Sequence, residues 1–185
     1  MKIIVAGLQR SGTNFFKELL IQNCSSTLEE HNDEIKSWKH DFPENIYIPS
    51  NTKLFYIRKN PYNWMYSIDK QPEDIHKRFN IGSEEGLALH YRDHCLAWAQ
   101  FIEKRKVFYT QYETLLKNPR FVVNRALRFY NLRMKETFVR PEKVNLSPDY
   151  NPEIYDKMYI DSEFKVSKVY SKMIEKYLRW FLWDN

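Results

Sequence analysis

The chain has 185 residues, 43% of them hydrophobic and 16% aromatic, which is enough apolar material for one well-buried core but little for two. Its net charge of +5 suits an anionic ligand, yet a dense Lys/Arg run and a nucleic-acid-binding motif are both absent. No apolar run approaches the ~20 residues that span a membrane. We therefore expect a single domain over residues 1–185, with no membrane span and no nucleic acid as partner.

The first twenty residues combine an apolar segment, a loop with two glycines and the start of a helix. Residues 3–6 are uninterruptedly apolar, which is typical of a buried strand in a parallel sheet. Gly7 and Gly12 bracket the loop, and Gly12 would let the backbone approach a ligand closely. The amides of residues 11–14 would open a helix whose positive end favours an anion, and Arg10 adds a planar, charged donor. This pattern predicts a P-loop-like phosphate-binding loop.

The loop differs from that of the nucleotide triphosphatases. Thr13 and Asn14 stand where Lys and Ser/Thr should follow the second glycine. The apolar runs at 54–57 and 107–109 are not followed by the carboxylate that would hold Mg²⁺. A small-molecule kinase using ATP and Mg²⁺ is therefore an alternative that the sequence disfavours, and a glycine turn without a ligand is a second alternative.

A second strand-to-helix turn follows in the middle of the chain. Residues 25–30 predict a short strand, and residues 53–57 predict a buried one that ends in Arg-Lys-Asn-Pro at 58–61. Proline suits the first turn of a helix, so residues 61–70 are predicted to be helical. Parallel strands end at the same edge of a sheet, where α/β folds bind ligands.

The remaining chain also alternates helices with strands. We expect a polar loop over 71–82, a long helix over 83–104, a strand over 106–110, short helices from 112 and 119, an irregular segment over 132–160 and a final amphipathic helix over 166–181. This alternation predicts an α/β fold, namely a three-layer sandwich with a central parallel sheet.

Four motifs together resemble those of the sulfotransferases that use 3′-phosphoadenosine-5′-phosphosulfate (PAPS). Residues 7–15 are similar to the family's 5′-phosphosulfate loop, in which Lys or Arg precedes Ser-Gly-Thr. Residues 56–61 with Ser67 resemble its 3′-phosphate motif, and the Lys-His pair at 39–40 falls where many members carry a catalytic Lys-x-His or Lys-His. Residues 112–119 are close to its Tyr-Glu-Asp-Leu…Pro segment. The C-terminal third carries no comparable signature.

The resemblance implies transfer of a sulfuryl group from PAPS to a hydroxyl or amine of an acceptor such as a carbohydrate or small metabolite. His40 would be the general base, because imidazole titrates near physiological pH. Lys39 would stabilise the transferring group, and Arg10 would stabilise the charge on the bridging oxygen. No metal is required. The residues expected to bind PAPS are Arg10, Ser11, Gly12, Thr13, Asn14, Phe15, Arg58, Lys59, Ser67 and Tyr112.

Several of these assignments have alternatives. Lys59 matches the family's basic residue when counted back from Ser67, while Arg58 would point the other way in a regular strand, and both stay candidates. Phe15 and Tyr112 could stack on adenine or pack in the core. Asn14 replaces a commoner Thr, and the glycine-rich C-terminal loop of the cytosolic small-molecule enzymes is absent. Their acceptor preferences are therefore not carried over, and the oligomeric state stays open.

Two further features bear on metal binding and on location. His90 and His94 are four residues apart on a predicted helix, a spacing that can hold a metal, but no third ligand lies nearby in the sequence, so we expect a structural pair. Cys24 and Cys95 form neither a disulfide framework nor a zinc pattern, and residue 1 leads directly into the apolar segment without a signal peptide. We expect a cytoplasmic protein. A noncatalytic nucleotide or nucleic-acid binding module is the alternative from another functional class.

Overall fold

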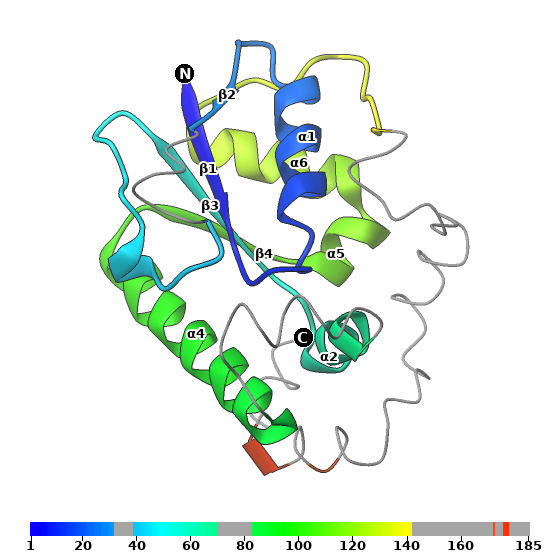
Figure 1. Cartoon of the computed structure of the whole chain (residues 1–185). Coiled ribbons are helices and arrows are strands. Elements are labelled where there is room, and N and C mark those ends of the chain that lie inside the picture. Colours follow the sequence, from blue (N-terminus) through cyan, green and yellow to red (C-terminus); the bar gives the residue numbers. More distant parts are fainter. Residues whose placement is uncertain (32–38, 70–82, 142–171, 173–175, 178–185) are drawn as a thin grey trace.

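Four parallel strands form the centre of the molecule (Figure 1). The computed structural model describes residues 1–31, 39–69, 83–141, 172, 176 and 177. The strands are β1 (Lys2–Ala6), β2 (Glu29–Glu30), β3 (Lys53–Arg58) and β4 (Val107–Gln111), in the order β2-β1-β3-β4. In the register, Val5 pairs with Phe55, and Phe55 pairs with Phe108. The parallel central sheet predicted from the apolar segments is confirmed.

Helices cover both faces of this sheet (Figure 1). On one face lie α1 (Thr13–Asn23), α5 (Tyr112–Lys117) and α6 (Pro119–Phe129), which enclose a core around Phe16 and Phe55. On the other face lies α4 (Glu84–Lys104), whose Trp98 stacks on Tyr56 with ring centroids 4.7 Å apart. Successive side chains of a strand point to opposite faces of the sheet. Alternate strand residues therefore pack into two separate cores. The three-layer α/β architecture is confirmed.

A third cluster of buried side chains forms beyond the carboxyl end of β3. Helix α2 (Pro61–Asp69) begins there and packs Trp64 against Tyr91 of α4 and against Leu8 of the loop after β1. The loop after β1 and the turn after β3 are thus joined by apolar packing as well as by the sheet.

Some sequence predictions differ from the structure or lie outside the described residues. The second strand is limited to Glu29–Glu30, because Ser25 instead donates its N–H to the carbonyl of Arg133 (2.9 Å). A short 3-10 helix, η1 (Pro43–Asn45), was not predicted. The predicted loop over 71–82 and most of the irregular segment and the final helix fall outside the described residues. Within the described ranges, no helix is long and apolar enough to cross a membrane.

The Tyr130 hydroxyl links the end of α6 to the amino ends of two strands. It accepts a hydrogen bond from Leu54 N (3.2 Å) and lies 2.5 Å from Leu54 O and 2.9 Å from Lys106 O, to which it can donate. Tyr130→Phe should therefore lower the free energy of unfolding by about 1–3 kcal/mol, since it removes the acceptor of the Leu54 N–H and the hydroxyl donor near the Leu54 and Lys106 carbonyls. Urea unfolding should show a lower midpoint with an unchanged slope. An unchanged midpoint would contradict this role.

Candidate active site

The loop after β1 and the turn after β3 meet at the carboxyl edge of the sheet, and the Lys59 ammonium makes the contact. Its Nζ donates one hydrogen bond to the carbonyl of Arg10 (3.1 Å) and another to Ser67 Oγ on α2 (3.0 Å). Lys59 is 1% exposed, so these bonds are shielded from water. The residues of the two predicted phosphate motifs therefore form one continuous group.

The backbone of the loop is oriented by donors that surround it. Four successive carbonyls each accept a hydrogen bond: Gly7 O from His40 Nδ1 (2.6 Å), Leu8 O from Ser11 N (3.0 Å) and Ser11 Oγ (2.5 Å), Gln9 O from Trp64 Nε1 (2.8 Å) and Arg10 O from Lys59 Nζ (3.1 Å). A carbonyl and the next N–H point in opposite directions across a trans peptide, so the amides of residues 8–10 face away from these donors. Backbone amides gathered in this way favour an anion.

Gly12 joins the loop to α1 in a conformation that other residues rarely adopt. Its φ is 86°, and a Cβ added there would lie 2.3 Å from ring atoms of Tyr112. Thr13, the first residue of α1, is buried, and within the described residues no side chain caps the helix. The first N–H groups of a helix have no partner within the helix and can bind an anion. Tyr112 also lies against Lys59, whose Nζ is 4.9 Å from the ring centroid, so its ring contacts both motifs.

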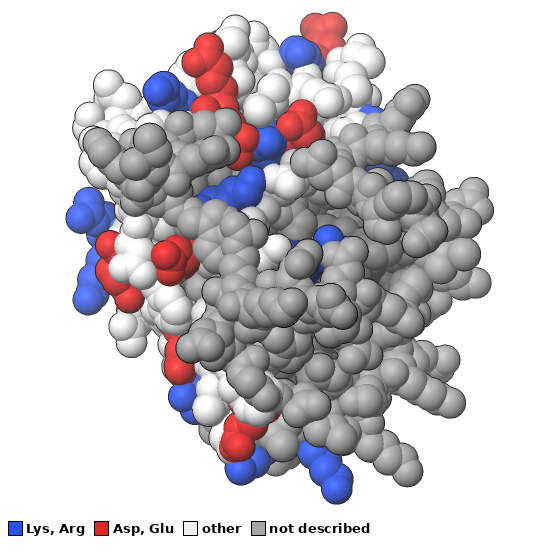
Figure 2. All heavy atoms as spheres, viewed as in Figure 1, with Lys and Arg blue, Asp and Glu red and all other residues white. Residues whose placement is uncertain are grey.

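The electrostatics of this group favour a bound anion. Burial holds the pKa of Lys59 well below its usual range, and the nearby charge of Arg10 lowers it further, against the opposing effect of Glu113. Within the described residues, Arg10 Nε is buried without a hydrogen-bond partner. Figure 2 shows Lys and Arg side chains interspersed with Asp and Glu over the described part of this face. A phosphate would compensate both cations at once.

His40 is anchored to the phosphate loop by two hydrogen bonds. Gly7 N donates to the carbonyl of Lys39 (3.1 Å), and Gly7 O accepts from His40 Nδ1 (2.6 Å). Because a carbonyl can only accept, Nδ1 carries the hydrogen and Nε2 carries the lone pair of the neutral ring. The ring is 9% exposed. The geometry suits a base that acts through Nε2.

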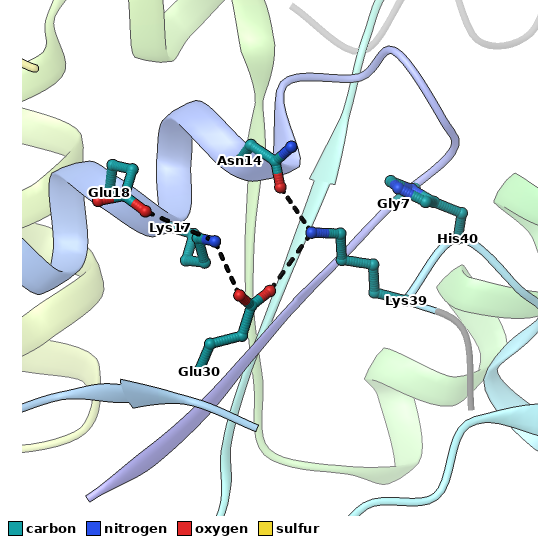
Figure 3. Close-up of polar contacts among 7 residues, drawn as sticks. All are labelled: Gly7, Asn14, Lys17, Glu18, Glu30, Lys39 and His40. Atoms are coloured by element: carbon teal, nitrogen blue, oxygen red, sulfur yellow. Dashed lines mark hydrogen bonds and ion pairs between the residues drawn. The ribbon is translucent and has the colours of Figure 1, made fainter. Parts of the chain in front are cut away.

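The Lys39 side chain points the other way, toward the first turn of α1 (Figure 3). Its Nζ donates to Asn14 Oδ1 (2.5 Å) and lies 3.3 Å from Glu30 Oε1. Burial lowers the pKa of Lys39, although the charge of Glu30 raises it in part. The ammonium therefore lies beside the amino end of α1.

Glu113 holds the turn that carries Lys59. Its Oε1 accepts hydrogen bonds from Asn60 N (2.9 Å) and Asn63 Nδ2 (2.7 Å), while Asn60 Oδ1 accepts from Tyr62 N (2.9 Å) in the first turn of α2. The first residues of α5 thus fix the start of α2.

Two of the residues predicted to bind PAPS lie apart from the others. Arg58 extends to the opposite face of the sheet, where its guanidinium lies 5.7 Å from the Tyr109 ring centroid. Phe15 is partly buried and packs against the core of α1, α5 and α6. The geometry therefore favours Lys59 over Arg58 as the partner of Ser67. The remaining residues gather at one edge of the sheet: Arg10, Ser11, Gly12, Thr13, Asn14, Lys39, His40, Lys59, Ser67 and Tyr112.

The model of the sulfotransferase domain family matches residues 39–177, which is most of the chain and includes His40, Lys59 and Tyr112. The chain belongs to the sulfotransferase domain family. Membership supports sulfuryl transfer as its general activity, and the resemblance found in the sequence motifs is confirmed. A search of curated proteins found no match.

This sulfotransferase positions its site with residues that lie outside the sequence motifs. Trp64 binds the carbonyl of Gln9, and His94 and Trp98 on α4 both donate to the carbonyl of Asp41, with His94 Nε2 at 3.1 Å and Trp98 Nε1 at 3.3 Å. Asp41 directly follows His40, so α4 restrains the backbone of the candidate base. In the sequence, His94 borders the apolar stripe of the long predicted helix, which indicated a structural role. Its contact with Asp41 supports that role.

Acid should destabilise this sulfotransferase through His94. Burial, and then the neighbouring His90, lower the pKa of His94 from 6.5 to about 3. Above about pH 6.5 the ring is neutral in folded and unfolded chains alike. Between about pH 6.5 and 3 the unfolded chain binds a proton that the folded protein does not, so stability falls as the pH falls.

His94→Gln keeps a donor for Asp41 O but does not titrate. Urea unfolding at about pH 7 and about pH 4.5 should therefore show a smaller loss of stability on acidification in this variant than in the wild type. Equal losses in the two proteins would rule out His94 as a source of the acid sensitivity.

Proposed function

We propose that the chain transfers a sulfuryl group from PAPS to a hydroxyl or amine of a carbohydrate or small-metabolite acceptor. The observation that supports PAPS is the Lys59 ammonium, which hydrogen-bonds to both the phosphate loop and Ser67. Two adjoining phosphate-binding groups suit a nucleotide phosphorylated at its 5′ and 3′ positions. Members of this family generally use PAPS as the donor.

Each phosphate has its own set of residues in this proposal. The 5′-phosphosulfate lies against the loop amides, the first turn of α1 and Arg10, where the buried Nε needs an acceptor. The 3′-phosphate binds Lys59, on the turn after β3, and Ser67, on α2. The Tyr112 ring lies beside both sets of phosphate-binding residues, since it is close to Gly12 of the loop and to Lys59.

The proposed chemistry is an in-line displacement at sulfur. The acceptor oxygen or nitrogen attacks the sulfur, and the bond from sulfur to the bridging oxygen of the phosphosulfate breaks. The acceptor proton passes to His40 Nε2, and 3′-phosphoadenosine 5′-phosphate (PAP) leaves with the electron pair. Lys39 and Arg10 stabilise the charge that develops on the sulfuryl group and the bridging oxygen.

The nucleotide preference tests the proposal. Losing a charge-assisted contact to a phosphate costs roughly 1.5–3 kcal/mol, so PAP should bind at least about tenfold tighter than ADP, with or without Mg²⁺. Lys59→Met removes the ammonium at similar size and should erase most of this preference. Arg58→Met is the matched variant from the other face of the sheet and should retain it. Isothermal titration calorimetry measures the affinities of the wild type and both variants for PAP and ADP.

The outcomes separate the alternatives. A preference for ATP with Mg²⁺ over PAP would favour the kinase and overturn the PAPS assignment. A preference for PAP that survives Lys59→Met but is lost in Arg58→Met would move the 3′-phosphate site to Arg58. PAP binding without any transfer, together with affinity for RNA, would favour a noncatalytic module.

To test the role of His40, a variant is needed that keeps the hydrogen bond to the carbonyl of Gly7 in the loop. His40→Asn keeps a donor near Gly7 O but has no second nitrogen to act as a base. Turnover, measured as sulfur-35 transfer from PAPS across a panel of sugars and small alcohols, should fall by ~10²–10⁴-fold. PAP affinity should change by less than about threefold, whereas His40→Ala should also weaken PAP binding, because it removes the loop anchor. Wild-type turnover in His40→Asn would assign the base to another group.

A further inference from the structure

Glu30 is a half-buried carboxylate at the edge of the sheet, outside every motif of the sequence. It ends the two-residue strand β2, where the register pairs it with Ile3 of β1. Its two oxygens are divided between two lysines: Oε2 lies 2.7 Å from Lys17 Nζ and Oε1 lies 3.3 Å from Lys39 Nζ (Figure 3). The carboxylate therefore links α1 with the segment that carries the candidate catalytic pair.

The other contact of the Lys39 ammonium belongs to the phosphate loop. Asn14 Oδ1, in the first turn of α1, accepts a hydrogen bond from Lys39 Nζ (2.5 Å). Lysine is a long side chain, and restraining its rotamers costs roughly 1.5–2 kcal/mol, so an unassisted ammonium would occupy many positions. Glu30 and Asn14 together hold it at one place, at the amino end of α1.

The charges around Lys39 show what Glu30 contributes. Burial lowers the pKa of Lys39, the carboxylate of Glu30 raises it, Lys17 lowers it, and the more distant Glu18 raises it. Within the described residues, Glu30 is the carboxylate in ion-pair contact with Lys39. Burial raises the pKa of Glu30, but the hydrogen bond from Lys17 and the charges of both lysines lower it overall, so the carboxylate stays ionised.

Lys17 makes the arrangement suitable for catalysis rather than for stability alone. Its contact with Glu30 is shorter than that of Lys39, and Lys17 also lies 3.5 Å from Glu18 (Figure 3). Glu30 therefore has an ion-pair partner in Lys17 that does not depend on its contact with Lys39.

We propose that Glu30 is a positioning residue that holds the Lys39 ammonium at the mouth of the phosphate loop for sulfuryl transfer. The inference deepens the proposed function and rests on it. Glu30 acts through Lys39 and contacts neither donor nor acceptor. Its loss leaves Lys39 less well placed and more easily deprotonated.

The test combines a charge-removing variant with a double-mutant cycle. Glu30→Gln should lower the turnover of PAPS with a panel of sugars and small alcohols about tenfold, with the KM for PAPS within about threefold. The alkaline limb of its pH–rate profile should move to lower pH. In a Lys39→Met background, Glu30→Gln should have no further effect, because the residue through which it acts is gone. An additive loss in that background, or unchanged turnover in the single variant, would overturn the proposal.

A control variant and a second measurement separate this proposal from the proposed function. Glu18→Gln removes another carboxylate that contacts Lys17 and should retain wild-type turnover; a loss equal to that of Glu30→Gln would assign the effect to net charge and overturn the proposal. NMR titration of isotope-labelled lysine in the free protein, with the Lys39 signal assigned from Lys39→Met, should show a lower pKa in Glu30→Gln. If the wild type transfers nothing from PAPS, the proposed function fails, and this titration still decides whether Glu30 controls Lys39. An unchanged Lys39 pKa would overturn the coupling.

Discussion

The site depends on one buried ammonium. Lys59 Nζ donates to the loop after β1 and to the helix after β3, and it does so where water is almost excluded. Burying a cation is unfavourable unless its hydrogen bonds are satisfied. The carbonyl of Arg10, the hydroxyl of Ser67 and the ring of Tyr112 meet this requirement from three different elements. The requirement fixes the relative positions of β1, α2 and α5, and hence the shape of the candidate site.

Supporting contacts extend from this centre to the candidate catalytic pair, Lys39 and His40. Glu113 restrains the turn that carries Lys59, and its charge opposes the tendency of Lys59 to deprotonate. On the other side of the loop, Gly7 binds the backbone of Lys39 and the ring of His40. In the proposed function, the phosphate loop thus separates Lys59, which would bind the nucleotide, from His40 and Lys39, which would act on the transferring group.

Much of the fold was predictable because the strands that matter are buried on both faces. An uninterrupted apolar run is the expected sequence of such a strand, and the helices between runs are set by Pro61, Pro119 and the apolar stripe of α4. The sequence left both Arg58 and Lys59 as candidates, although the alternation of strand residues indicated that Arg58 would point the other way, and the geometry favours Lys59. The loop and the Lys-His pair were identifiable because their chemistry depends on neighbouring residues.

What the sequence did not reveal depends on contacts between distant segments. Nothing local to Glu30 or Trp64 indicates that one would face Lys39 and the other would bind the carbonyl of Gln9. The extent of β2 was overestimated for a similar reason: Ser25 bonds to Arg133, more than a hundred residues further along the chain. Such contacts arise only when the three layers close.

The hydrogen bonds to the four loop carbonyls have a consequence for the thermodynamics of ligand capture. A flexible glycine loop would lose conformational entropy on closing around a phosphate, and that loss would reduce the affinity. Here the loss has already occurred during folding, because donors on α2, on the turn after β3, in the loop itself and in the His40 segment hold the peptide groups in place. The loop is pre-organised, so the interaction energy of an incoming anion goes into affinity rather than into ordering the backbone.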